Sequence, residues 1–335
     1  MKELAAELRK YKQVYVVCDR NVIGFARRIR HDNLLAITAD EAHKTIDTVM
    51  DICRWLCDNG ADRDALVLAV GGGVTTDMAG FAASIYKRGI RYANIPTTLL
   101  SMVDAGIGGK TGVNLDGYKN LLGVIRQPEF TAIFPEVLET LPERELRSGL
   151  AEMLKTFIIK NPRNAYETAV RLFSAASFAS LGMTEKEKLA ELIQLAAGIK
   201  QDIVEKDEFE SGLRRKLNLG HTWAHAIEWW QKGSFAGARN DTTFTHGEAV
   251  AIGMVQAAKY TERHGLAEEP GLADRITKDL KACGLPTALP CPAEELLPAI
   301  LKDKKTYGSK IKLVLPLRIG KVAVKTVPSE SIAEA

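Results

Sequence analysis

The segment from Leu66 to Tyr86 constrains the fold of this chain more than any other. An apolar run, Leu66–Val70, passes directly into three glycines and then into a helix-compatible stretch, Met78–Tyr86. This order is typical of a buried β-strand, a tight turn and the start of a helix. Backbone in such a turn can approach a phosphate closely, and the N–H groups at the helix start attract its charge. The pattern is not GxGxxG, because Thr76 replaces the third glycine, so a phosphate-binding turn and an ordinary glycine turn of an α/β protein both remain open.

Polar residues that suit a phosphorylated sugar follow this segment. Thr97 and Thr98 supply hydroxyls, Asp104 a carboxylate, Lys110 a cation on a glycine-rich stretch, and 119–120 a Lys-Asn pair. These groups are the donors and acceptors that a polyhydroxylated, phosphorylated ligand requires. The lysine also suggests a P-loop, but that motif needs a glycine where this chain has Asp104. The nucleoside triphosphatase class is therefore excluded.

Length and composition limit the remaining classes. A chain of 335 residues is expected to form two domains. The net charge of +3, with no basic tract, gives no reason to expect nucleic acid as a partner. The N-terminus has mixed charge, unlike a signal peptide, and no apolar run is long enough to cross a membrane. The 5 cysteines form no CxxC pair, which favours reduced thiols and a cytoplasmic protein.

Hydrophobic patterns change character near residue 143. Before it, strands are predicted at Val14–Asp19 and Leu34–Thr38, with a helix from Asp40 to about Asn59. Alternating strands and helices predict a mostly parallel sheet covered on both faces. After it, helical patterns dominate, so the second domain is predicted to be mainly α-helical. These patterns cover residues 143–160, 163–180, 184–206, 220–231, 247–264 and 271–282. The segment 229–245 is predicted to be a mobile loop.

Histidines and charged residues in the second half suggest a metal site. His221 and His225 are spaced i, i+4 on one predicted helix, a spacing that by itself suggests two zinc ligands, and His246 heads another helix. Packed or capping histidines would give the same pattern. Glu152 and Lys155 are spaced i, i+3, which taken alone predicts an ordinary surface salt bridge. Other basic residues, taken singly, are also expected to be solvated surface charges.

Eight sequence blocks between residues 66 and 320 resemble the 3-dehydroquinate synthase family and follow its order. They are GGGVTTDMAG, KRGIRY, IPTTLLSMVDAGIGGKTGVN, YKNLLG, LETLPERELRSGLAEMLK, DEFESGLRRKLNLGHTWAHAIE, HGEAVAIGM and DKKTYGSKIKLVLPLRIG. The resemblance implies an N-terminal Rossmann-like, mostly parallel α/β domain (1–143) and a C-terminal, mainly α-helical metal- and substrate-binding domain (144–335). The active site is then expected in the cleft between the halves.

The same resemblance implies an activity, cofactors and partners. The expected reaction converts 3-deoxy-D-arabino-heptulosonate 7-phosphate to 3-dehydroquinate and phosphate, a step of the shikimate pathway. It combines transient oxidation by NAD, phosphate elimination, reduction and aldol cyclisation. NAD and a divalent metal, zinc or cobalt, are the implied cofactors. The implied partners are a sugar phosphate that carries a carboxylate and a second copy of the chain, in a homodimer.

Site residues follow from the resemblance by position. Glu152, His221 and His246 are the implied metal ligands, with His225 facing the substrate instead. The implied catalytic residues are Lys155, Glu210, Arg214 and His225. The implied substrate-binding residues are Arg88, Asp104, Lys110, Asn120, Lys155, Lys200, Arg214, Asn218, His225 and Lys304. The implied cofactor-binding residues are Asp19, Asn21, Glu41, Lys44, Gly72, Gly73, Val74, Asp77, Thr97, Thr98, Leu100, Asp104, Lys110, Lys119 and Thr140.

A substrate with a carboxylate and a phosphate needs two separate cationic poles. Arg214, with its planar guanidinium, is expected at the carboxylate pole. The residues expected at the phosphate pole are Lys110, Asn120, Asn218, His225 and Lys304, with Lys305 as the alternative to Lys304. Arg88 is expected to reach the phosphate site of a neighbouring subunit.

Three other readings remain open. Another NAD- and metal-dependent sugar-phosphate cyclase would act on a substrate without a carboxylate, which Lys200 and Arg214 argue against. A metal-dependent polyol dehydrogenase of the same fold would lack a phosphate pole, which Lys110 and Asn218 argue against. A relative that has lost catalysis would lack some ligands, whereas all those expected are present.

Overall fold

The structure is a computed structural model that describes residues 1–335 except 31, 176–180, 235–242, 304–309 and 335. The chain divides into two compact units, Met1–Leu141 and Pro142–Ala335. Each unit has its own layers and its own core.

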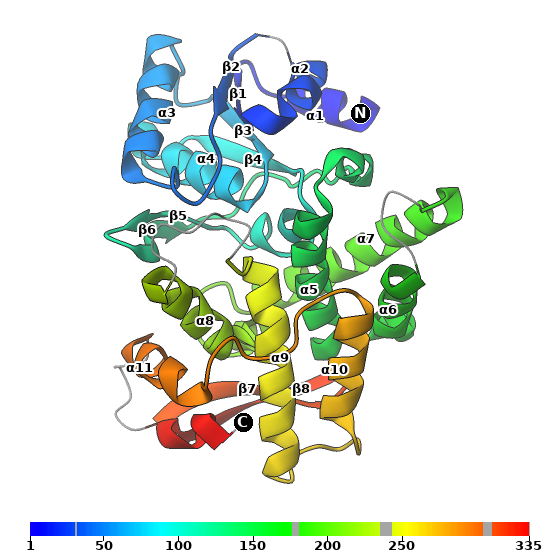
Figure 1. The fold of residues 1–335 in the computed structure, drawn as a ribbon. Helices are drawn as coiled ribbons and strands as arrows, with labels where there is room; N and C mark the ends of the chain where they lie inside the picture. Colours follow the sequence, from blue (N-terminus) through cyan, green and yellow to red (C-terminus); the bar gives the residue numbers. More distant parts are fainter. Residues whose placement is uncertain (31, 176–180, 235–242, 304–309, 335) are drawn as a thin grey trace. The chain divides into compact units, whose positions relative to one another are not determined.

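The first unit is built on a four-stranded parallel sheet (Figure 1). Its strands are β1 (Val14–Asp19), β2 (Leu34–Ile37), β3 (Leu66–Gly71) and β4 (Arg91–Pro96), in the order β2-β1-β3-β4. Its helices are α1 (Lys2–Leu8), α2 (Ile23–Ile29), α3 (Ile46–Asp58) and α4 (Gly73–Ile85). Apolar runs buried on both faces are what a parallel sheet between two helical layers requires, and the predicted sheet is confirmed.

Alternate residues of the strands supply two separate cores. Tyr15 and Val17 of β1 pack with α3 and α4 on one face, whereas Val14 and Val16 pack with α1 and α2 on the other. The period of two along the strand therefore places a helical layer on each side. The carboxyl ends of β3 and β4 then meet the start of α4, where the glycine turn lies.

Two features of this unit differ from the expectation. The predicted helix start at Asp40 is wrong, because α3 begins at Ile46 with Thr45 as its N-cap, and the Thr45 side chain accepts a hydrogen bond from the Thr48 amide. Residues 40–43 form bends before it. Strands β5 (Lys110–Leu115) and β6 (Tyr118–Ile125) form an antiparallel hairpin that was not predicted. Lys110, the lysine of the glycine-rich stretch, is thus the first residue of β5.

The second unit is mainly helical. Its helices are α5 (Glu143–Ile159), α6 (Ala165–Ala175), α7 (Met183–Lys206), α8 (His221–Ser234), α9 (His246–Arg263), α10 (Leu272–Ala282) and α11 (Ala293–Asp303). The 3₁₀ helix η7 (Leu213–Asn218) precedes α8. Most residues of α5 and α9 are buried, so these two helices form the centre of the unit.

Two glycines of α9 allow its neighbours to approach to backbone contact. A Cβ atom at Gly247 would lie 2.0 Å from the Ser148 carbonyl oxygen of α5, and one at Gly253 would lie 2.0 Å from the Gly220 carbonyl oxygen. Any larger residue would therefore push α5, or the start of α8, away from α9. This close packing brings the starts of α8 and α9 to the middle of α5.

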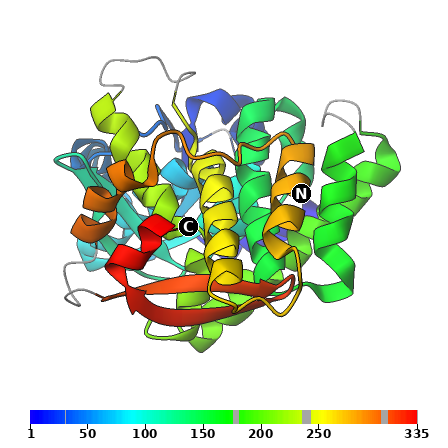
Figure 2. The ribbon, with the colours of Figure 1, turned by 60° about the horizontal axis from the view of Figure 1, so that its bottom comes forward.

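Elements at the end of the chain were not predicted. Strands β7 (Lys310–Arg318) and β8 (Lys321–Pro328) form an antiparallel hairpin, which Figure 2 shows running across one end of the helices. α11 also lies outside the predicted helices. The predicted loop 229–245 is wrong at its start, since α8 continues to Ser234, while 235–242 lie outside the described residues.

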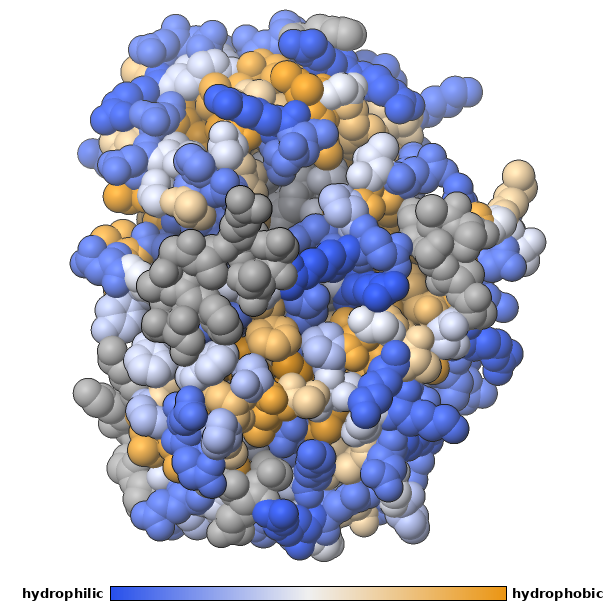
Figure 3. Space-filling model, in the orientation of Figure 1, coloured by the Kyte–Doolittle hydropathy of each residue, from blue (hydrophilic) through white to orange (hydrophobic). Residues whose placement is uncertain are grey.

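Hydrophilic side chains cover most of the face shown in Figure 3, with apolar ones in small groups. Among the described residues, no helix is both long and apolar enough to cross a membrane.

Candidate active site and metal centre

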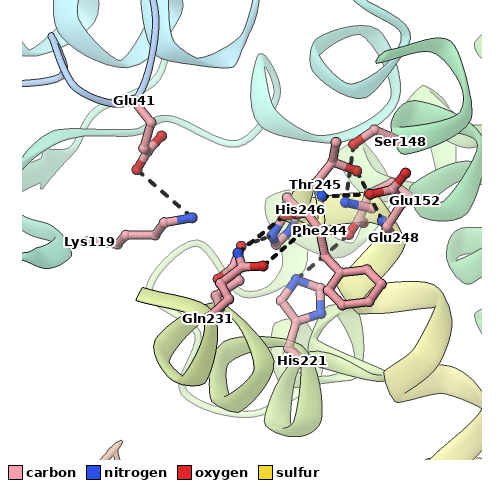
Figure 4. A network of polar contacts seen from close by, with 12 residues as sticks. Glu41, Lys119, Ser148, Glu152, His221, Gln231, Phe244, Thr245, His246 and Glu248 are labelled. Carbon is pink, nitrogen blue, oxygen red and sulfur yellow. Dashed lines mark hydrogen bonds and ion pairs between the residues drawn. The ribbon is translucent and has the colours of Figure 1, made fainter. Parts of the chain in front are cut away.

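Three side chains from three helices meet at the centre of the second unit. Glu152 comes from the middle of α5, His221 from the first residue of α8 and His246 from the first residue of α9. Their candidate ligand atoms all lie within 4.8 Å of one another (Figure 4). Glu152 Oε1 lies 3.4 Å from His246 Nε2 and 3.8 Å from His221 Nε2. One carboxylate and two imidazoles are a donor set that zinc accepts.

The surroundings of Glu152 fit a carboxylate that ligates a cation. The residue is 0% exposed, and its carboxylate faces the imidazoles of His221 and His246. Lys155, one turn further along α5, contacts Oε2 as an ion pair. Buried charges are normally paired or coordinate metals, and this carboxylate lies between a lysine and two imidazoles, which are common metal ligands. The side chains of this cluster therefore fit a bound divalent metal ion.

Both imidazoles present Nε2 to the cluster because their other nitrogens are held. His221 Nδ1 lies 3.1 Å from the Leu219 carbonyl oxygen, and His246 Nδ1 lies 3.1 Å from Glu228 Oε1. A proton on Nδ1 can donate to each acceptor, which leaves the Nε2 lone pair for a cation.

Electrostatics around the cluster favour a positive charge between the donors. Burial and the Lys155 charge lower the pKa of His221 to about 3, so its ring is neutral at pH 7. Burial opposes protonation of His246, but hydrogen bonds to Glu152 and Glu228 outweigh it and raise its pKa to about 10. Burial likewise opposes ionisation of Glu152, but Lys155 and the imidazoles hold its pKa well below the usual range. A proton and a metal ion would therefore compete for His246.

The expectation that basic residues here are solvated surface charges is wrong for three of them. Lys155 is 1% exposed, Lys200 of α7 is 7% exposed and Arg214 of η7 is 2% exposed. The Glu152–Lys155 pair is likewise buried rather than a surface salt bridge. Buried cations are rare in proteins, and these three concentrate positive charge in the interior of the second unit.

A loop held by one carboxylate carries several of the expected substrate residues. Asp207 Oδ2 accepts from the amides of Gly212 and Arg214 at 2.8 and 2.9 Å, and its Oδ1 accepts from the amide and hydroxyl of Ser211. Within the loop, Glu210 has a φ of 58° and accepts from Asn218 Nδ2 at 2.5 Å. The loop thus brings Glu210, Arg214 and Asn218 to the turn before His221.

His225 lies one turn after His221 on α8, with ring centroids 5.5 Å apart. It is exposed and is not part of the ligand group, so the structure separates the two histidines that spacing alone had paired.

The start of α9, which carries His246, is fixed from several sides. Thr245 and Glu248 form a capping box. Arg144 bonds both Glu248 oxygens and also contacts the Thr243 carbonyl oxygen. The Gln231 side chain accepts from the Phe244 amide at 2.8 Å and donates to its carbonyl oxygen (Figure 4). These contacts fix the backbone on the N-terminal side of His246.

In the first unit, the glycine turn leaves backbone amides at the start of α4. Gly72 is the N-cap and supplies no capping side chain, so N–H groups of the first turn remain for an external acceptor. A Cβ at Gly73 would lie 2.8 Å from the Cβ of Ala105, so this position also needs glycine. Thr97 donates its amide to the Gly71 carbonyl, and Thr98 bonds Ser101. Val74 belongs to the same first turn of α4.

Lys44 joins expected cofactor and substrate residues of the first unit. It is 5% exposed, and its ammonium lies 2.5 Å from both Asp77 Oδ2 and Asn120 Oδ1. Nearby, Glu41 accepts from Asn114 Nδ2 at 2.9 Å and lies 4.0 Å from Lys119 Nζ (Figure 4). These six side chains connect the segment before α3 with α4 and with the β5–β6 hairpin.

Other expected residues of the first unit come from several separate elements. Asp19 accepts from the Asn21 amide at 2.9 Å and caps a short 3₁₀ turn. Arg88 is exposed, with a φ of 69°, and lines a surface hollow of about 610 Å³ with Lys87 and Arg63. The remaining expected residues are Leu100 before the π-helical turn Ser101–Ala105, Asp104 within it, Lys110 at the start of β5 and Thr140 at the end of the 3₁₀ helix Pro135–Thr140. Lys304 lies outside the described residues.

Glu228 was not among the residues predicted for the site. It follows His221 and His225 at i+7 and i+3 on α8, which places all three on one face of the helix. This spacing was the available signal, and the GHTWAHAIE block contains it.

Comparisons with known proteins agree over most of the chain. The model of the 3-dehydroquinate synthase N-terminal region matches residues 34–148, and that of the C-terminal region matches residues 149–306. A 3-dehydroquinate synthase of Dictyoglomus thermophilum is 42% identical over 296 residues, which cover 88% of this chain and 79% of the relative.

Solved structures add two similar folds. The structure of 2-epi-5-epi-valiolone synthase from Streptomyces hygroscopicus subsp. jinggangensis, with NAD+ and Zn2+ bound, has a TM-score of 0.84 and 30% identity, and covers 99% of this chain and 92% of that one. The crystal structure of 2-deoxy-scyllo-inosose synthase, complexed with carbaglucose-6-phosphate, NAD+ and Co2+, has a TM-score of 0.81 over 99% of this chain and 93% of that one. At 24% identity, the second comparison supports the fold alone.

Proposed function

The chain belongs to the 3-dehydroquinate synthase family of enzymes, and on this premise we propose that it converts 3-deoxy-D-arabino-heptulosonate 7-phosphate to 3-dehydroquinate and phosphate. The observation that carries the proposal is the buried cluster of Glu152, His221 and His246 with Lys155 against its carboxylate. The reaction would be a phosphate-eliminating lyase reaction with zero net redox change.

Glu152, His221 and His246 would hold a divalent metal, zinc or cobalt. When bound, such a metal lowers the pKa of a substrate hydroxyl and so prepares it for oxidation. Three protein ligands leave positions for substrate oxygens. The fixed Nδ1 contacts of both histidines orient Nε2 before the metal arrives, so little reorganisation is required.

Arg214 would bind the substrate carboxylate. Its planar guanidinium matches a carboxylate with two parallel hydrogen bonds, which a lysine cannot reproduce. Lys155 and Lys200 add buried positive charge in the same unit. We propose Lys110 and Asn120 of the first unit, and Asn218 and His225 of the second, as phosphate-binding groups. Glu210, held by Asn218, would act together with Lys155 and His225 in catalysis.

The first unit would bind NAD, which carries a hydride from the substrate and returns it. The amides at Gly72–Val74 suit its pyrophosphate because the helix N-terminus attracts negative charge. Lys44, Asp77, Glu41 and Lys119 would contact the rest of the cofactor. The remaining proposed contacts are Asp19, Asn21, Thr97, Thr98, Leu100, Asp104, Lys110 and Thr140.

We also propose a homodimer in the cytoplasm. Arg88 is exposed beside other cations, where it is accessible to a second copy of the chain. The cysteines at 18, 53, 57, 283 and 291 are all unpaired thiols, which agrees with a reducing compartment.

The experiment measures phosphate release by the purified protein loaded with Zn2+ or Co2+, given the heptulosonate phosphate and catalytic NAD. Phosphate equal to the substrate consumed, with no accumulation of NADH, is the expected result, and a His246→Ala variant should be inactive. Phosphate released from sedoheptulose 7-phosphate, but not from the heptulosonate phosphate, would identify a cyclase for substrates without a carboxylate. NADH accumulating from glycerol, with no phosphate released, would identify a polyol dehydrogenase.

A further inference from the structure

Glu228 is a buried carboxylate that contacts a ligand of the cluster without being a ligand itself. It is 5% exposed and lies on the same face of α8 as His221. Its Oε1 lies 3.1 Å from His246 Nδ1, on the side of the ring opposite to the nitrogen that faces Glu152. A buried carboxylate at this position requires a partner, and the imidazole N–H is one.

The two histidines of the cluster are held by acceptors of different charge. The Leu219 carbonyl oxygen that contacts His221 is neutral, whereas the Glu228 carboxylate that contacts His246 is negative when ionised. A charged acceptor binds the N–H more strongly and increases the electron density at the other ring nitrogen. The His246 ring is therefore both fixed and made a better donor.

We propose that Glu228 is a positioning residue for the metal, acting through His246. It fixes the tautomer with the proton on Nδ1, so that the Nε2 lone pair is directed to the cluster. It also supplies negative charge near a centre where Lys155 is positive, which favours a divalent cation. This inference rests on the proposed metal-binding function of Glu152, His221 and His246.

A purely structural role would also explain the contact, since Glu228 joins α8 to the start of α9. Glu248 provides a matched comparison. It also holds the first turn of α9, through Arg144 and the Thr245 amide, but it contacts no imidazole of the cluster. Glutamine at this position can still accept from the Thr245 amide, so Glu248→Gln should lower stability through the lost charge facing Arg144 and leave metal affinity nearly unchanged.

The experiment measures the Zn2+ affinity of metal-free protein by competition with a chelator, for wild type, Glu228→Gln, Glu228→Ala and Glu248→Gln. Glutamine can still accept the Nδ1 hydrogen bond but carries no charge, whereas alanine removes both. We expect affinity losses of about 10-fold for Glu228→Gln and about 100-fold for Glu228→Ala. Glu248→Gln should bind within about threefold of wild type. The visible spectrum of the Co2+-loaded protein should change for the Glu228 variants alone.

Two outcomes separate this inference from the proposed function. Wild type that binds Zn2+ tightly, with Glu228→Gln and Glu228→Ala equal to it, would overturn the role of Glu228 and leave the metal site intact. Wild type that binds no stoichiometric Zn2+ would overturn the metal site itself. If Glu228→Ala does not fold, Glu228→Gln still decides the question.

Discussion

Gly247 packs directly against the Ser148 backbone, with its amide 3.1 Å from Ser148 Oγ and the carbonyl oxygen of Ser148 2.0 Å from where a Cβ would be. Because His246 precedes Gly247 and Glu152 lies one turn after Ser148, this contact sets the separation of two candidate ligands. Gly247→Ala should force α9 away from α5. We expect a loss of about 1–3 kcal/mol in the free energy of unfolding and weaker Zn2+ binding, measured by urea titration and chelator competition.

Gly198→Ala is the matched control. Gly198 lies within α7, and a Cβ there would meet no atom within 4 Å. The substitution should stabilise the protein by about 0.5–1 kcal/mol, since alanine favours the helix, and leave Zn2+ affinity unchanged. Equal stability and equal affinity for the two variants would show that the contact with Ser148 does not set the geometry of the cluster.

Sequence patterns predicted most of this fold where burial was uniform. The strands β1 and β3 are continuous apolar runs, and the central helices α5 and α9 carry long helical patterns. The start of α3 was placed too early because Asp40 and Glu41 resemble a first helical turn, whereas Thr45 provides the cap. The hairpin β5–β6 was missed because its strands contain glycines and polar residues rather than an apolar alternation.

The sequence predicted which residues form the site better than it predicted how they are packed and buried. Spacing along α8 paired His221 with His225, but only the three-dimensional packing of α5, α8 and α9 brings His221 together with Glu152 and His246. Spacing also cannot report burial, so Lys155, Lys200 and Arg214, taken singly, were expected on the surface, and only the family resemblance placed them at the substrate site. Tertiary packing decides both properties, and no local pattern contains it.

The buried pair of Glu152 and Lys155 should behave as a unit. Glu152→Gln removes the carboxylate that Lys155 contacts, so we expect a loss of about 3 kcal/mol in the free energy of unfolding together with the loss of Zn2+ binding. Adding Lys155→Met should restore most of the stability and none of the Zn2+ binding. Urea titration and chelator competition measure the two effects. If Glu152→Gln alone were as stable as wild type, the stability of the two residues would not be coupled.

Asp207 should contribute stability that depends on pH. Hydrogen bonds from the Arg214, Gly212 and Ser211 amides outweigh burial and lower its pKa from the ordinary value of 3.8. Because the folded pKa is the lower one, this stabilisation is complete above the unfolded pKa and is lost as the pH falls through 3.8 and below. Asp207→Asn should therefore reduce the urea midpoint at pH 7 by more than at about pH 3.5.

The control for this pH dependence is Asp202→Asn. Asp202 lies on α7 and forms an exposed ion pair with Lys160. Exposed ion pairs contribute little, so its urea midpoint should stay close to wild type at both pH values. A difference between Asp207→Asn and wild type that is the same at both pH values would mean that the Asp207 charge does not hold the loop.

Arg214 should distinguish a carboxylated substrate from other sugar phosphates. Its amide is held by Asp207, and its guanidinium donates to the Glu208 carbonyl oxygen at 2.5 Å, so the group is fixed in one place. Arg214→Lys keeps the charge but loses the planar pair of donors. We expect kcat/KM for the heptulosonate phosphate to fall about 10- to 100-fold, as the loss of a charged hydrogen bond predicts.

Inhibition by inorganic phosphate separates the two poles in the same variant. Because Arg214 is proposed for the carboxylate, the inhibition constant of inorganic phosphate should not change in Arg214→Lys. Arg171→Lys, an exposed substitution on α6, should leave both quantities unchanged. An inhibition constant that rises together with the loss of kcat/KM would assign Arg214 to the phosphate pole, and the enzyme would then need another cation to select a substrate with a carboxylate.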